Sequence, residues 1–320
     1  IVLSYVVITG YVGQISVMQL ALSGTAGFAL SHLAVQARIP FPFDALGATL
    51  LATLLGVAAG ISALRVRGVS LAVVTLAAAL AMEEALFGNT SFGGTAGVSV
   101  PPPRLFGVNL GPGADFRGLD GNEPSPMFGF LVLAVTAGLG LYVAHLRRTG
   151  LGRRMLAVRS NERAAAAAGV DVRAVKIAAF AISSFIASVA GTLYGYNFGS
   201  VSAARFTALA ALGLIGFAYI GGITMVSGAV IAGLMSTEAL LPHALDTWFG
   251  IKGTWALLFG GVSLIVTLIA NPDGIAGANH RRRTAKKAAR AAAQDSAPDG
   301  PRAADKHLAP AALDTPEVAS

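Results

Sequence analysis

Apolar segments recur along the chain and constrain its fold more than any other feature; several are long enough to cross a membrane, 206–222 and 224–241 are marginal, and 1–12 is short. They lie at 1–12, 18–37, 43–63, 69–88, 127–146, 174–197, 206–222, 224–241 and 254–270. A membrane-spanning helix needs roughly 20 apolar residues, because it must cross about 30 Å of hydrocarbon. The pattern predicts an all-α fold, a polytopic transmembrane bundle of about eight to nine membrane segments.

The composition supports this class and excludes others. Of the 320 residues, 54% are hydrophobic and 12% are charged, whereas soluble domains contain about 25% charged residues. The absence of cysteine excludes disulfides, thiolate metal sites and cysteine nucleophiles. The net charge of +7 does not indicate nucleic acid as a partner, because the basic residues lie between apolar stretches and in a tail. We therefore expect a membrane protein surrounded by lipid.

Lysine and arginine are distributed unevenly among the connections, which indicates the orientation of the chain. Cytoplasmic loops of membrane proteins carry an excess of these residues. The connection at 147–176, the turn at 64–68 and the C-terminal tail are basic, whereas 89–126 contains only Arg104 and Arg117. We expect 89–126 to be an external loop with irregular backbone. The protein would be a multi-pass protein of the cell (inner or plasma) membrane with a cytoplasmic C-terminus.

A change in composition near residue 278 divides the chain into two regions. We expect a transmembrane domain over 1–277 and a basic, Ala-rich cytoplasmic tail over 278–320. Disorder is predicted for this tail, and a surface helix that binds anionic lipid is the alternative. Because Ile1 lies inside an apolar run, we also expect that residues before it are missing.

The connection at 147–176 predicts a short helix followed by a sharp turn. Ser160 is a candidate N-cap, and Asn161 to Ala168 are mostly helix formers. Gly169 stands where a left-handed residue would end this helix, and Asp171 can cap the next one. Two interpretations stay open at this point. The helix either lies at the membrane interface, held by its basic flank, or docks its small-residue face into a groove of a cytoplasmic partner.

The sequence of this connection resembles that of a known protein family. The stretch Gly152–Ala166, followed by Gly169-Val170, resembles the coupling loop of ABC-importer permeases, in particular the LivM-type permeases of branched-chain amino-acid uptake. The family pattern is G-R-x-x-x-A-[IV]-R-x-N-E-x-A-A. The resemblance implies that this loop contacts an ATPase, and it assigns that role to Gly152, Arg153, Arg159, Asn161, Glu162, Arg163, Ala165 and Gly169. Arg159, Glu162 and Arg163 would supply charged rim contacts.

Other stretches resemble the same family in the same order. They are Gly10–Ser16 with Gln19, Leu64–Val69 with Thr75-Leu76, Gly93–Val98, Lys176 with Ala179-Phe180 and Ala190–Gly195, and, more weakly, Gly221-Gly222 through Gly228. The resemblance implies a permease subunit without cofactor, metal or catalytic residues, in which ATP hydrolysis belongs to separate subunits. It implies as partners two ABC ATPases, a second, LivH-type permease and an external solute-binding protein. Branched-chain amino acids are the expected solute, and urea, other amides and other amino acids remain alternatives.

Several residues are candidates for the transport path. Gly13, Gln14, Ser16 and Gln19 interrupt two apolar segments, either as a broken helix that lines a path or as a short cytoplasmic turn. The external pair Gly93-Gly94 belongs to the family pattern. Glu83 and Glu84 lie at the outer part of an apolar segment, where they would border the path or bind an ammonium group. The alternative for them is an interfacial position with pairing to Arg104.

Two glycine pairs have structural interpretations. Gly191 and Gly195 form a small-x-x-x-small face, which favours helix packing, and Gly221-Gly222 fits a simple turn. The sequence also lacks the phosphate loop of ATPases, the nucleophile elbow and the H-E-x-x-H zinc motif. Two rivals to the importer remain. One is an ion- or proton-coupled transporter that works alone, supported only by Glu83 and Glu84, and the other is a structural membrane scaffold.

Overall fold

Helices dominate the computed structural model, which describes residues 1–64, 69–89, 92, 97–114, 125–236 and the single positions 247, 262, 266 and 269. All of them belong to one compact unit, Ile1–Ala278. The predicted tail lies outside the described residues, as does most of the predicted segment 254–270. The helices are α1 (Val2–Tyr5), α2 (Gln19–Ser31), α3 (Phe43–Ala63), α4 (Val69–Met82), α5 (Pro126–Leu146), α6 (Gly150–Ser160), α7 (Glu162–Ala167), α8 (Val172–Phe198), α9 (Ala208–Gly221) and α10 (Val226–Met235).

Three of these helices continue as π-helical turns, in which the backbone is locally widened. They are η1 (Val6–Tyr11) after α1, η2 (His32–Gln36) after α2 and η3 (Glu83–Phe87) after α4. A 3₁₀ turn, η4 (Ala203–Arg205), precedes α9. The predicted helical membrane fold is thus confirmed.

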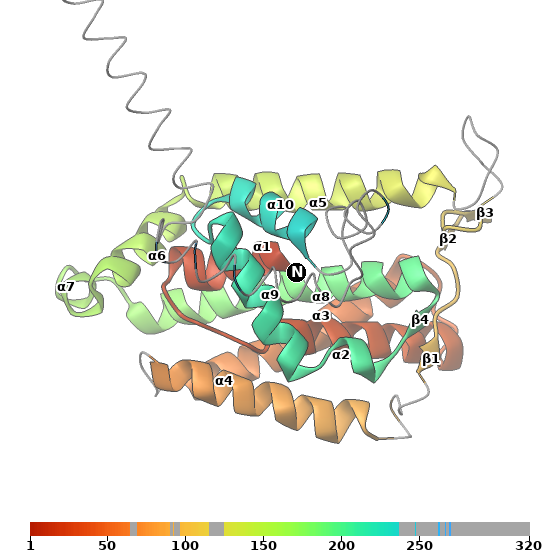
Figure 1. Ribbon diagram of the computed structural model, residues 1–320, viewed down its shortest axis with the longest axis horizontal. Coiled ribbons are helices and arrows are strands. Elements are labelled where there is room, and N and C mark those ends of the chain that lie inside the picture. Colours follow the sequence, from red (N-terminus) through yellow and green to blue (C-terminus); the bar gives the residue numbers. More distant parts are fainter. Residues whose placement is uncertain are drawn as a thin grey trace, which may run out of the picture. The chain divides into compact units, whose positions relative to one another are not determined.

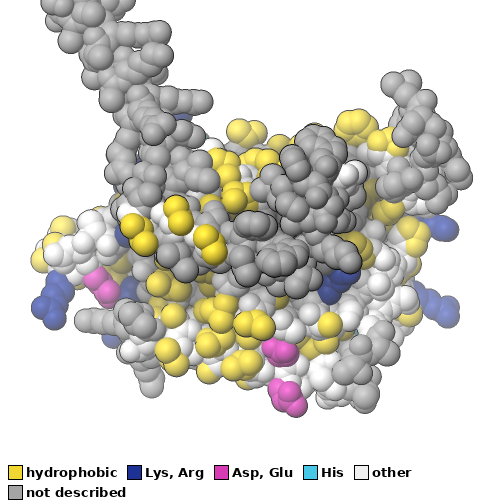
Figure 2. Space-filling model, viewed as in Figure 1, with side chains coloured by type: hydrophobic (Ala, Val, Ile, Leu, Met, Phe, Trp, Pro, Cys, Tyr) yellow, Lys and Arg dark blue, Asp and Glu magenta, His cyan; other side chains and the backbone are white. Residues whose placement is uncertain are grey.

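Five helices of the described part are long and apolar enough to cross a membrane: Phe43–Ser62, Ser70–Phe87, Pro126–Leu146, Val172–Phe198 and Ala203–Gly221. The predicted segments 1–12 and 224–241 contain shorter apolar helices, Val2–Tyr11 and Val226–Met235. On the face drawn in Figure 2, apolar side chains lie over much of the described surface, and several Lys and Arg side chains lie toward the left and right ends, while two acidic side chains lie at the lower middle.

Helix α2 occupies the centre of the bundle. Every residue from Gln19 to Ser31 is buried, because α3, α4, α8 and α9 pack around this helix. A helix enclosed by protein needs no lipid-facing surface, and α2 accordingly carries Ser23 and Thr25 inside its apolar sequence. Its long neighbour α8 is the principal support, since both helices run side by side through the bundle (Figure 1).

Small residues allow α2 and α8 to approach closely. A Cβ atom on Gly191 of α8 would overlap the backbone carbonyl of Ser23, and one on Gly195 would come within 3.3 Å of Leu30 and Val201. The predicted packing role of Gly191 and Gly195 is therefore confirmed. At the next interface, Gly56 of α3 leaves the space that Ser184 of α8 occupies.

Short strands replace part of the irregular backbone that we expected in 89–126. Strand β1 (Val98–Ser99) pairs antiparallel with β4 (Ser200–Val201), and β2 (Arg104–Leu105) pairs with β3 (Val108–Asn109). The Ser31 hydroxyl also donates a hydrogen bond of 2.6 Å to the Ser99 carbonyl. These contacts fix the loop to the ends of α2 and α8, opposite the end where α6 and α7 lie (Figure 1).

The close α2–α8 contact predicts unequal effects of the same substitution at two helical glycines. Gly191→Ala should destabilise the protein by about 1–3 kcal/mol, because the added methyl group overlaps backbone. Gly138→Ala on α5, where a Cβ atom meets nothing within 4 Å, should leave stability unchanged or raise it by up to about 1 kcal/mol. Thermal unfolding of both variants in mild detergent measures this. Equal melting temperatures for the two variants would contradict the packing assignment.

Candidate functional site

Helix α6 begins the basic connection and is anchored to the bundle on one side. The Thr149 hydroxyl caps it by accepting a hydrogen bond of 3.2 Å from the backbone N–H of Gly152. Gly152 is buried, and a Cβ atom there would overlap the carbonyl of Leu146 at the end of α5. Met155 and Val158 point into the core, whereas Arg153 and Arg154 are exposed.

Helix α7 starts one residue later than the predicted cap. The prediction of Ser160 as N-cap is wrong, because Ser160 still belongs to α6 and its hydroxyl donates to the Ala157 carbonyl at 2.8 Å. Asn161 is extended instead, with φ −158°, and its side-chain oxygen accepts from the N–H groups of Arg163 and Ala164 at 3.1 Å. An amide oxygen one position later serves the same capping purpose.

The end of α7 confirms two predictions. Gly169 is left-handed, with φ +82°, and its N–H donates to Ala166 O, while the Val170 N–H donates to Ala165 O, both at 3.0 Å. This pair of bonds is a Schellman motif, which closes a helix where glycine tolerates positive φ. The Asp171 carboxylate then caps α8 by accepting from the Ala174 N–H at 3.0 Å.

The two faces of α7 differ. Ala165 is buried and packs into the core of the bundle, so it holds α7 in place and is not part of its outer surface. The outward face consists of small residues together with Asn161 and Arg163; the exposed alanines are Ala164, Ala166, Ala167 and Ala168. The structure therefore offers a small, stiff helical face at the end of the molecule.

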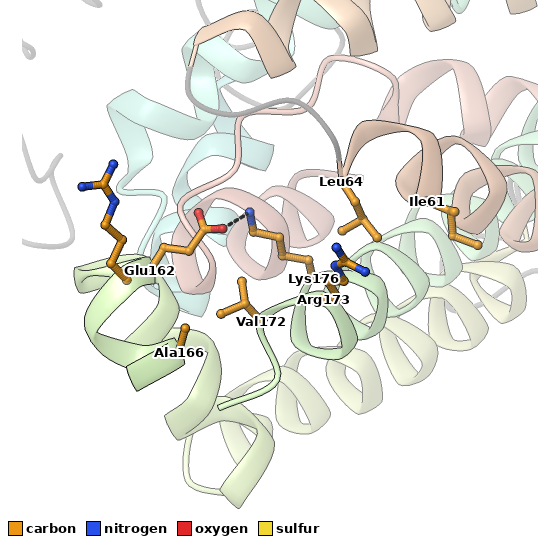
Figure 3. Close-up of a pocket in the computed structure, with 8 residues that line it drawn as sticks. Ile61, Leu64, Glu162, Ala166, Val172, Arg173 and Lys176 are labelled. Carbon is orange, nitrogen blue, oxygen red and sulfur yellow. Dashed lines mark hydrogen bonds and ion pairs between the residues drawn. The ribbon is translucent and has the colours of Figure 1, made fainter. Parts of the chain in front are cut away.

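Glu162 turns toward the bundle. Its carboxylate forms an ion pair of 2.9 Å with Lys176 of α8, whose side chain is only 6% exposed, while that of Glu162 is 33% exposed. Figure 3 shows this pair at the side of a cavity of about 760 Å³ between α7, the start of α8 and the end of α3. Leu64, Val172 and Arg173 also line this cavity. Glu162 thus fastens α7 to α8.

Arg159 also points inward. Its guanidinium nitrogen Nη1 donates a hydrogen bond of 2.5 Å to the carbonyl of Gly10, at the end of η1. A Cβ atom on Gly13, which has φ +76°, would lie 3.0 Å from the Arg159 Cγ atom. Gly10 in turn abuts the backbone of Ile223, in the turn between α9 and α10. Three stretches that resemble the family, far apart in sequence, therefore meet at one point.

Residues 12–18, which we call the break, separate η1 from α2 and run through the bundle without helical structure. The Val17 N–H donates to the Thr75 hydroxyl of α4 at 3.1 Å, and the Thr9 hydroxyl donates to Gln14 O at 3.0 Å. Gln14 and Ser16 are buried, as is Gln19 at the start of α2. The groups that cover this irregular backbone come from this chain.

The buried amides of this region are incompletely paired. The Gln19 Nε2 atom lies 3.5 Å from the hydroxyls of Ser16 and Ser183, at the limit of a hydrogen bond. The Oε1 atoms of Gln14 and Gln19 have no partner in the described part of the chain. An unpaired buried polar group is costly, so these amides are held less firmly than fully bonded ones.

The other path candidates are separated from this region. Glu83 accepts a hydrogen bond of 2.9 Å from the Ala208 N–H, at the start of α9, and Glu84 is exposed. Among the described residues neither forms an ion pair with Arg104, so the predicted alternative of that pairing is wrong. A carboxylate at a helix N-terminus satisfies a free N–H group and the helix dipole. Gly93 and Gly94 lie outside the described residues.

Gly221 and Gly222 lie at a turn, as the sequence predicts. Gly222 has φ +107°, a conformation that favours glycine. The turn is also a close contact, because Cβ atoms on Gly221 or Gly228 would overlap the backbone of the opposite segment. From the sequence we expected Arg159 to make rim contacts, and its bond to Gly10 was not predicted. Gly13 could have indicated this bond, because a glycine there leaves room for the Arg159 side chain.

Apolar helices of membrane-spanning length define the class as a helical membrane protein. The family described as branched-chain amino acid transport system / permease component matches residues 1–268, and the chain belongs to that family. Its members are permease components rather than enzymes. The resemblance found from the coupling-loop sequence is thereby confirmed.

Individual relatives agree with this membership. The chain is 31% identical over 242 residues to the high-affinity branched-chain amino acid transport system permease protein LivM of Escherichia coli, with 71% of this chain and 55% of the relative covered. It is 34% identical over 126 residues to the xylose transport system permease protein XylH of Haemophilus influenzae, with 38% and 31% covered. The chain spans about half the length of the LivM relatives that it matches. No solved structure matches.

The buried ion pair predicts a stability effect that a second substitution relieves. Glu162→Ala should destabilise the protein by about 1–3 kcal/mol, because it leaves the Lys176 charge buried; partial exposure of Glu162 reduces the effect below that of a fully buried pair. Adding Lys176→Met should restore much of this loss, since the apolar side chain removes the unpaired charge. Thermal unfolding in detergent tests both. A double variant less stable than the single one would contradict the assignment.

Proposed function

We propose that this chain forms part of the membrane path of an ATP-driven importer for small polar solutes, with branched-chain amino acids as the solute. The family description and the LivM relatives support this solute, since their matches cover 71% and 68% of the chain. Matches to xylose permeases cover 38–48% of the chain, and so they favour a sugar less.

The α6–α7 segment (Gly150–Ala167) is the observation that carries the proposal. Its outer face is small, exposed and stiffened by caps at both ends, while its inner side is fastened to α8 by Glu162 and to Gly10 of η1 by Arg159. Such a helix suits a groove on a cytoplasmic partner. We assign the partner as an ATPase dimer, which would push on the segment when it closes on ATP and make the helices rock.

The remaining partners follow from the same proposal. A second permease of the LivH type would complete the path, and an external protein would deliver the solute. The chain would be a multi-pass protein of the inner membrane with its basic tail, 278–320, in the cytoplasm and its transmembrane domain over 1–277. The solitary ion-coupled transporter is less well supported, because Glu83 is occupied as a helix cap and Glu84 is exposed.

Docking through α7 predicts a position-dependent effect of a bulky residue. Ala167→Trp should reduce the amount of ATPase that purifies with the chain by about tenfold or more, the factor that a loss of roughly 1.4 kcal/mol in an interface produces. Membrane insertion should not change, since Ala167 is exposed. The matched control is Ala204→Trp, an equally exposed alanine beyond the opposite end of α8. Equal ATPase recovery with both variants would refute docking through α7.

A further inference from the structure

The Arg159 side chain bonds the α6–α7 segment to Gly10 of η1, two residues before the break. It belongs to the last turn of α6, and its guanidinium holds the Gly10 carbonyl at 2.5 Å. We propose that Arg159 is a positioning residue that transmits movement of the α6–α7 segment to the break. This inference rests on the proposed function, because an ATPase must supply the movement.

The backbone around Gly10 leaves the Gly10 carbonyl to accept this bond. The N–H groups of Gly13 and Gln14 turn back to Thr9 O and Ile8 O, each at 3.1 Å, while the guanidinium satisfies Gly10 O. A cation at the carboxyl end of a helix is favourable, and a charge-assisted hydrogen bond is roughly twice as strong as a neutral one. The bond is therefore suited to transmit a displacement of α6 to η1.

Space on both sides of the Arg159 side chain allows it to move. One cavity of about 210 Å³ includes Gln14 and Lys176 in its lining, and another of about 190 Å³ includes Ile15 and Tyr219. Both are also lined by Gly13 and Arg159. The Arg159 side chain thus borders two cavities rather than close-packed core, and it can shift with little repacking nearby.

The segment that receives the movement is weakly held. Beyond Gly13, the buried amides of Gln14 and Gln19 keep unpaired oxygens, and Gln19 reaches its hydroxyl partners only at 3.5 Å. The break is held by the bonds of Val17 to Thr75 and of Thr9 to Gln14, and its amide side chains add no strong contact to them. Arg159 is exposed along part of its surface, but its guanidinium lies against η1, where it bonds to the Gly10 carbonyl.

Arg159→Met is the substitution that tests this role, because it keeps an unbranched stem beside Gly13 and removes the donors. The matched control is Arg154→Met, an exposed position on the same helix. Each variant is purified as the complete complex in proteoliposomes, and ATPase recovery, ATP hydrolysis and solute uptake are measured. The natural chain has no cysteine, so Ile15→Cys added to each background reports movement of the break through its rate of maleimide labelling with and without ATP.

We expect Arg159→Met to retain ATPase recovery and hydrolysis but to lose uptake by about tenfold or more, the factor that a charge-assisted hydrogen bond is worth. The ATP-dependent change in labelling should disappear with it, while Arg154→Met preserves both. Unchanged uptake and labelling in Arg159→Met would overturn the proposal, as would loss of ATPase recovery, which would make Arg159 a docking contact. Absence of any ATPase from the unsubstituted complex would instead refute the proposed function.

Discussion

The need of every buried backbone group for a hydrogen-bond partner governs this structure. In a bilayer no water satisfies an unpaired N–H or C=O group, so non-helical backbone must be covered by protein. The break at residues 12–18 bonds to Thr75 of α4 and Thr9 of η1, and Arg159 of α6 bonds to Gly10 just before the break. Because the break leads directly into α2, this helix is enclosed as well, and the longer helices α3 and α8 pack around it.

The same constraint links the membrane domain to the basic connection. A carbonyl at the end of η1 is satisfied by a guanidinium from α6, and Gly13 makes room for that approach. Lys176 and Glu162 make a second link, from α7 to the start of α8. The α6–α7 segment, which would receive force from a partner, is thereby bonded both to the long helix α8 and to the region of the break.

Sequence patterns predicted the helices well, because segments of about 20 apolar residues have few other stable forms in lipid. Gly169 and Asp171 were also predictable, since positive φ and helix capping are local properties. The partners of Arg159, Glu162 and Glu83 were not, because each lies in another element and sequence spacing carries no information on it. The cap at Asn161 was missed by one residue, since serine and asparagine cap helices about equally well.

The most direct test of the central claim is a cryo-electron microscopy structure of the complex purified with this chain from mild detergent. The account predicts an ATPase whose groove receives the exposed alanine face of α7, with Arg159 still bonded to Gly10 on the inner side. A map in which α7 faces lipid or solvent while an ATPase binds elsewhere would contradict it, as would a homo-oligomer without any cytoplasmic partner.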